Sequence, residues 1–122
     1  MNDSPPGEPD QTNKQHVLIM EFITEVNRDL ERLREGDADL AALLPTSWRR
    51  LQITAHNIGA RAEGLDLQVL QVCARELERF AMEVLTPTVS DKSESIEGAM
   101  VALEMLDLEL YALKRDLPSR SR

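Results

Sequence analysis

Four stretches of this chain carry apolar residues at alternating steps of three and four, which is the repeat of one face of an α-helix. They run from about Lys14 to Arg34, from Pro45 to Gly64, from Asp66 (the expected N-cap) to Leu85, and from about Ser93 to Leu117. No stretch shows the strict apolar–polar alternation of a half-buried strand. Because four such helices with short connections bury their stripes by packing side by side, the sequence predicts an all-α protein, an antiparallel four-helix bundle.

The two ends of the chain are predicted to lie outside this bundle. Residues 1–13 are polar and proline-rich, and they cannot bury enough apolar surface to offset the entropy lost on ordering, so we expect a disordered tail. Pro118 is expected to stop the last helix, which leaves a frayed end over 119–122. One bundle domain over 14–118 remains, with a short helical turn expected over 37–44.

The composition of the chain limits which partners and which cellular compartment we expect for it. The formal net charge is −8, which argues against nucleic acid as the main partner because phosphate backbones attract clustered Lys and Arg. No apolar run approaches the length of a membrane span, and the start of the chain lacks a secretion signal. The single cysteine, Cys73, excludes an internal disulfide and fits a reducing compartment. These observations predict a cytoplasmic protein, favoured as a monomer, with no membrane partner.

Motifs that bind cofactors or metals do not appear in the sequence. There is no glycine-rich phosphate loop, no Cys-x-x-Cys, no His-Glu-x-x-His and no Glu-x-x-His pair. Cys73 falls on an apolar stripe and is interpreted as a structural thiol. We therefore expect no bound metal and no cofactor.

The residue that stands out is His56, one of two histidines in the chain. It lies about 100° from the apolar stripe of its helix, so one side can pack while the other meets solvent. A histidine that carries a phosphoryl group needs one exposed ring nitrogen and a second nitrogen that donates to a carboxylate. Glu78 and Glu76 on the next helix are candidates for that carboxylate. The neighbours of His56 on its own helix are Gln52, Gly59, Ala60 and Glu63.

The run from His56 (His-Asn-Ile-Gly-Ala-Arg-Ala) to Glu78 (Cys-Ala-Arg-Glu-Leu-Glu) resembles the histidine-containing phosphotransfer domain, most closely the chemotaxis-kinase type. The resemblance implies that His56 is the phosphoacceptor of a two-component phosphorelay and that Glu78 orients it. It implies a phosphocarrier without kinase activity, whose partners are a response-regulator receiver domain or a histidine kinase. Magnesium would come with the receiver. The implied receiver-facing surface comprises Gln52, Gly59, Ala60 and Glu63.

The chain departs from this family at the residues that follow the histidine. Members usually carry Lys and Gly there, whereas this chain has Gly59 and Ala60. Arg49 or Arg61 could supply the positive charge of the lysine that is absent at Gly59. Alternatively, the loss of this lysine could mark an adaptor that binds a receiver or kinase without transferring phosphate. A third interpretation is a bundle unrelated to signalling, in which His56 is an ordinary surface residue.

Overall fold

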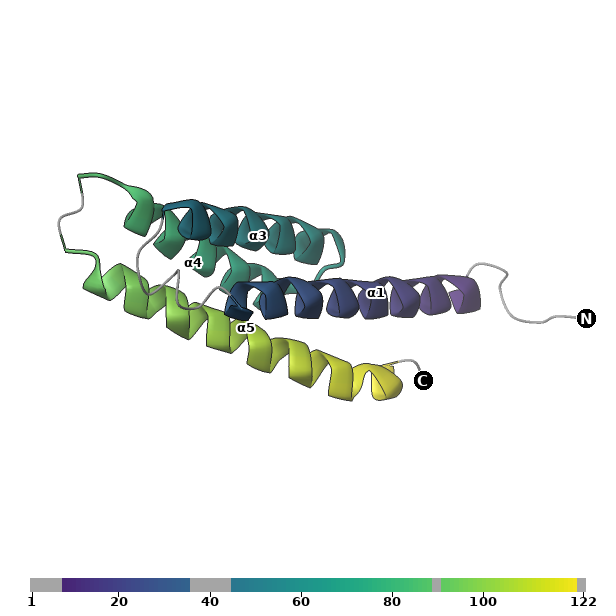
Figure 1. Ribbon diagram of the computed structural model, residues 1–122. Helices are drawn as coiled ribbons and strands as arrows, with labels where there is room; N and C mark the ends of the chain where they lie inside the picture. The colour runs from purple at the N-terminus through teal and green to yellow at the C-terminus, as the bar shows by residue number, and fades with distance from the viewer. Residues whose placement is uncertain (1–7, 36–44, 89–90, 121–122) are drawn as a thin grey trace, which may run out of the picture.

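The structure, a computed structural model, is made of four long helices that lie side by side (Figure 1). It describes residues 8–35, 45–88 and 91–120, and these contain no strand. Successive helices run in opposite directions, so the start of α1, the α3–α4 turn and the end of α5 share one end of the molecule. The predicted all-α four-helix architecture is confirmed. The helices are α1 (Glu8–Glu35), α3 (Pro45–Gly64), α4 (Gln68–Leu85) and α5 (Ser93–Arg120).

The core forms where the four apolar stripes meet. Its largest fully buried side chains come from every helix: Trp48, Phe22, Leu30, Leu51, Ile58, Leu77, Leu106, Leu110 and Val26. The buried residues of α3 and α4 include several small ones, namely Ala55, Gly59, Ala62, Ala74 and Ala81. Small side chains let two helices approach closely, and α3 and α4 accordingly form an extensive contact.

The turn between α3 and α4 is closed by a helix-ending motif. The amide of Leu67 donates to the carbonyl of Ala62 (2.8 Å) and that of Asp66 to Glu63 (3.1 Å), which is the pattern of a Schellman motif. Asp66 has a φ of 59°, a left-handed conformation that aspartate tolerates better than most residues. The expectation that Asp66 caps α4 is therefore wrong. It ends α3, and Leu67 occupies the N-cap position of α4 without a side-chain bond.

The start of α5 is where the sequence predicts it, at Ser93. The carboxylate of Asp91 accepts a hydrogen bond from the backbone amide of Ser93 at 3.0 Å, and hydrogen bonds from Ser93 lower the pKa of Asp91. Two residues further on, the buried Ser95 hydroxyl donates to Glu83 of α4 at 2.8 Å. The Asp91 bond caps the start of α5, and the Ser95 bond joins α5 to α4.

Two helix ends differ from the sequence-based prediction. α1 begins at Glu8 instead of Lys14, because a proline is tolerated in the first turn of a helix, where its missing N–H would have no partner within the helix. α5 continues to Arg120, because Pro118 removes only one backbone bond so near a helix end. The remaining parts of the predicted tail, turn and frayed end, residues 1–7, 37–44 and 121–122, lie outside the described residues.

Among the described residues, two ion pairs join α1 to the other helices. Glu25 pairs with Arg61 of α3, and Arg34 pairs with Asp107 of α5. The guanidinium of Arg61 also lies over the ring of Phe22, 5.5 Å from its centroid. None of the described helices is long and apolar enough to cross a membrane.

Replacement of Leu77 by alanine tests the core. Leu77 is completely buried in the middle of α4, so Leu77→Ala should lower the free energy of unfolding by about 2–5 kcal/mol. Urea unfolding followed by circular dichroism measures this. Val72→Ala, on the same helix but 61% exposed, is the matched control and should change the free energy by less than about 0.5 kcal/mol. Equal effects would contradict the assignment of Leu77 to the core.

Candidate functional site

His56 projects from the outer surface of α3. Its side chain is 62% exposed, whereas Ala55, the residue before it, is completely buried. This is the position at the edge of the apolar stripe that the sequence predicts. The ring can therefore be reached by another protein without any movement of the core.

Glu78 of α4 holds one nitrogen of this ring. His56 Nδ1 and Glu78 Oε2 are 3.0 Å apart, and the Glu78 side chain is 21% exposed. An ionised carboxylate can only accept hydrogen bonds, so Nδ1 must carry the proton. In the neutral ring this leaves a free electron pair on Nε2. The contact thus fixes the tautomer in which Nε2 is the nucleophilic atom.

The alternative partner, Glu76, is engaged elsewhere. Its carboxylate accepts a hydrogen bond from Arg79 Nη2 at 2.6 Å, one turn along α4. Arg79 also pairs with Glu83 at 3.1 Å, and the hydrogen bond to Glu76 raises the pKa of its guanidinium. Of the two carboxylates that the sequence left open, the structure places Glu78 against the histidine.

The four residues expected to surround His56 do not all lie on the surface. Ala60 and Glu63 are exposed and Gln52 is half-buried. Gly59 is buried instead, because α4 passes directly over it. A methyl group placed on Gly59 would stand 3.6 Å from the Cβ of Ala74 and 3.6 Å from a methylene of the next residue of α4. Both distances are ordinary van der Waals contacts, so α4 packs closely on α3 at Gly59, and an alanine there would also fit.

Exposed apolar side chains flank one end of the His56–Glu78 pair. Ile53 precedes His56 by one helical turn and Met82 follows Glu78 by one turn. Because α3 and α4 are antiparallel, both lie toward the same end of the bundle. Their exposed fractions are 54% and 49%. An accessible histidine with exposed apolar side chains one turn away on both helices is suited to contact with a folded partner.

The sequence offered Arg49 and Arg61 as positive charges near His56. The structure shows a third arginine, Arg75, that the sequence analysis missed and that is better placed for this role. Arg61 is paired with Glu25, and Arg49 is exposed two turns before His56. Arg75 of α4 lies over Gly59, one turn from Glu78, with its Cγ at the 3.6 Å contact. In the sequence, Arg75 could have been noticed because it lies three residues, about one helical turn, before Glu78. Its position opposite Gly59, however, follows only from the antiparallel register of α3 and α4.

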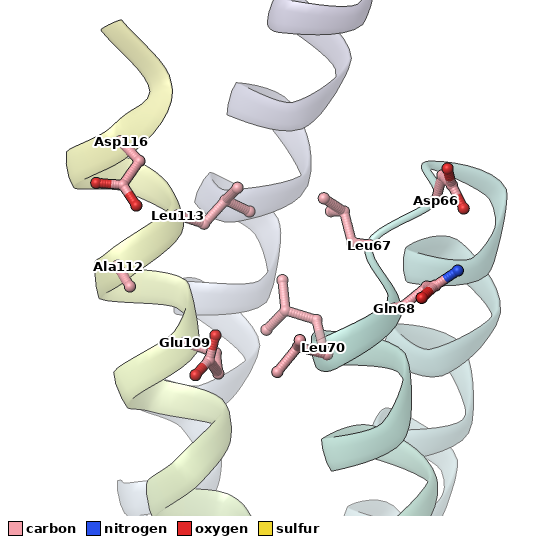
Figure 2. Close-up of a pocket in the computed structure, with 9 residues that line it drawn as sticks. Asp66, Leu67, Gln68, Leu70, Glu109, Ala112, Leu113 and Asp116 are labelled. Carbon is pink, nitrogen blue, oxygen red and sulfur yellow. The ribbon is translucent and has the colours of Figure 1, made fainter. Parts of the chain in front are cut away.

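A separate hollow lies between the start of α4 and the second half of α5 (Figure 2). Its floor is apolar, and the carboxylates of Asp66, Glu109 and Asp116 stand at its rim. It contains neither His56 nor Glu78. In the part of the chain that the structure describes, no group of His, Cys, Asp and Glu side chains is arranged to hold a metal ion.

Cys73 is half-buried beside the core. Burial raises the pKa of its thiol, and the nearby carboxylates of Glu109 and Glu76 raise it further. The thiolate is the reactive form of cysteine, so this group is poorly suited to nucleophilic chemistry at neutral pH. The interpretation of Cys73 as structural agrees with this position.

The site defines a class: an all-α bundle with a solvent-facing histidine whose second ring nitrogen is held by a glutamate. Comparison of the chain with family models, curated proteins and solved structures found no match. The resemblance to the phosphotransfer family thus remains a prediction, and the chemistry of the site rests on the geometry above.

The tautomer of His56 provides a direct test of this geometry. Glu78→Ala should shift the ring proton from Nδ1 toward Nε2, because the carboxylate that accepts the Nδ1 proton is removed. Long-range ¹H–¹⁵N spectra of the imidazole report which nitrogen is protonated. Glu76→Ala, which removes a carboxylate bound to Arg79, is the control and should leave the tautomer unchanged. An identical response of the two variants would rule out Glu78 as the orienting group.

Proposed function

We propose that this protein is a phosphotransfer carrier, in which His56 accepts a phosphoryl group from an aspartyl phosphate of a receiver domain and passes it to another receiver. The observation that carries the proposal is the hydrogen bond between His56 Nδ1 and Glu78, on a ring that is 62% exposed. This arrangement leaves the nucleophilic nitrogen where a second protein can reach it. The resemblance of the segment from His56 to Glu78 to the phosphotransfer family supports the same conclusion.

In the proposed reaction, the electron pair of Nε2 attacks phosphorus in line with the bond to the aspartyl oxygen. The phosphorus–nitrogen bond forms and the phosphorus–oxygen bond breaks, and its electrons return to the receiver as a carboxylate. The ring then carries a positive charge, with the proton still on Nδ1 and still bonded to Glu78. No proton has to leave, and the reverse reaction loads a second receiver. The carboxylate of Glu78 stabilises the charge that develops on the ring.

The reaction also needs charge neutralisation, which we assign to the partner, and positioning, which we assign to the docking surface. Phosphoryl transfer between two side chains depends mainly on positioning and on neutralising charge. We propose that the receiver supplies magnesium and that Ile53 and Met82 contribute apolar contact beside the histidine. The exposed position of His56 and of these two side chains is compatible with docking of a receiver as a rigid body.

The first experiment is to incubate the purified chain with phosphorylated receivers and with histidine kinases from its own source. We expect an acid-labile, base-stable label on the wild type and none on His56→Gln. His16→Gln removes the other histidine, on α1, and should keep the label. Because His56 is mostly exposed, His56→Gln should change the free energy of unfolding by less than about 0.5 kcal/mol, which urea unfolding verifies.

Label that persists on His56→Gln would contradict the proposal. Receiver binding without any phosphohistidine, under conditions in which the receiver is fully phosphorylated, would instead support an adaptor. That outcome is the alternative raised by Gly59, where the family usually has a lysine. The adaptor hypothesis also expects His56→Gln to bind the receiver as tightly as the wild type does.

A further inference from the structure

At the position three residues after His56, α3 carries no side chain, and Arg75 of α4 lies next to it. The stem of Arg75 lies over the backbone of Gly59, with its Cγ 3.6 Å from where a Cβ would stand. From this point the guanidinium turns toward Glu63, whose Oε2 lies 3.4 Å from Arg75 Nη2. The stem of Arg75 is thus anchored midway along α3 between His56 on one side and Glu63 on the other.

The pair between Arg75 and Glu63 is a weak one. It consists of a single long contact, and its side chains are 50% and 62% exposed. Surface ion pairs of this kind contribute between about 0 and 1 kcal/mol. A phosphoryl group carries up to two negative charges and can accept two parallel hydrogen bonds from a guanidinium, so it is a stronger partner for Arg75 than one carboxylate.

We propose that Arg75 is the cation of the phosphoryl site and that it exchanges Glu63 for the phosphoryl group on His56. This inference rests on the proposed function. His56 and Glu63 lie about 4.5 and 6 Å along the helix axis from Gly59, in opposite directions, and both are within reach of the terminal bonds of an anchored arginine. The positive charge that the family places on the histidine's own helix is thereby supplied from the neighbouring helix.

The test compares four variants in transfer from a phosphorylated receiver to His56. Arg75→Ala should lower the equilibrium yield of phosphohistidine about tenfold, the value expected for loss of a hydrogen bond to a charged group. Arg75→Lys should recover most of the yield, and Glu63→Gln should raise it, because the competing carboxylate is gone. Arg79→Ala removes an arginine one turn away that is bound to Glu76 and Glu83, and should have no effect.

A second readout separates this role from a merely structural one. ³¹P spectra of the phosphorylated protein follow ionisation of the phosphoryl group, and loss of a neighbouring cation should raise the pKa of that group in Arg75→Ala but not in Arg79→Ala. Equal yields and equal titrations in the two variants would overturn the role of Arg75 while leaving the proposed function intact. Absence of label on the wild type would instead overturn the proposed function.

A different surface, between α4 and α5, carries an inference that is independent of His56. An apolar groove is lined there by Val72, Val101 and Met105, with exposed fractions of 61%, 54% and 44%. Phe80 and Gly98 also line it, and a Cβ on Gly98 would lie 2.5 Å from the Phe80 ring. The missing side chain at Gly98 therefore lets the aromatic ring lie against the α5 backbone.

The carboxylates that line this groove are those of Glu76, Glu94 and Glu97. Arg79 balances Glu76 and lies over the Phe80 ring. On the other side, α5 carries Glu94 and Glu97 and contains no Lys or Arg between Ser93 and Leu113, so the α5 side of the groove is negative. A second copy of this chain would bring like charges together, whereas a basic partner would find opposite charges beside an apolar floor. We infer that the groove docks an amphipathic helix with a basic face from a partner protein. At 100° per residue, Phe80 lies roughly 160° around α4 from Glu78, so this docking leaves His56 accessible.

The probe is a fluorescent 18-residue helical peptide of Leu and Lys, with Leu at steps of three and four, and a matched peptide of Leu and Glu. The basic peptide should bind in fluorescence anisotropy and the acidic one should not. The uncharged substitutions Val101→Asn and Met105→Gln should together weaken binding at least fivefold. Val17→Gln, at a similarly exposed apolar residue of α1, should leave it unchanged.

Equal binding of the basic peptide to wild type and to the Val101 and Met105 variant would overturn the inference, because it would show adsorption to charge alone. Sedimentation of the protein without peptide provides the other decisive result. A dimer that the same two substitutions dissociate would assign the groove to a second copy of the chain and would also overturn the proposed partner.

Discussion

The close antiparallel packing of α3 against α4 is the constraint on which the rest of the molecule depends. Small buried residues, Ala55, Ala62, Ala74 and Ala81, together with Gly59, let the two helices approach until α4 lies directly over α3. The short turn at Asp66 makes the two helices antiparallel, and the packing of their side chains sets their relative register. That register places the carboxylate of Glu78 against the ring of His56, and the site would not exist in a bundle slipped by one turn.

The His56 site combines three features along one strip of surface. An apolar pair, Ile53 and Met82, lies at one end, the oriented histidine stands in the middle, and Arg75 with Glu63 lies at the other end. Each feature matches a separate requirement of the proposed phosphoryl transfer: contact with a partner, a nucleophile with a fixed tautomer, and positive charge near the proposed phosphoryl group. The strip is formed by α3 and α4 alone, so α1 and α5 support it by completing the core.

Two glycines lie inside helices, Gly59 in α3 and Gly98 in α5, where glycine costs about 1 kcal/mol relative to alanine. At Gly98 the absence of a side chain is required, because a Cβ there would lie 2.5 Å from the Phe80 ring. At Gly59 a Cβ would make ordinary contacts of 3.6 Å with Ala74 and Arg75. Gly98 therefore shapes the apolar groove, whereas the packing of α4 on α3 at Gly59 does not require glycine.

The sequence by itself determined the four helices and the faces that they bury, and it singled out His56 as the candidate site residue. These depend on local periodicity and on residue type. It failed at helix ends, where Asp66 could end one helix or begin the next, and at Gly59, which was expected on the surface. The choice between Glu78 and Glu76, the burial of Gly59 and the placement of Arg75 opposite it were decided only by the tertiary structure. These depend on the register between two helices, which is set by the packing of all their side chains at once and is not encoded in any one segment.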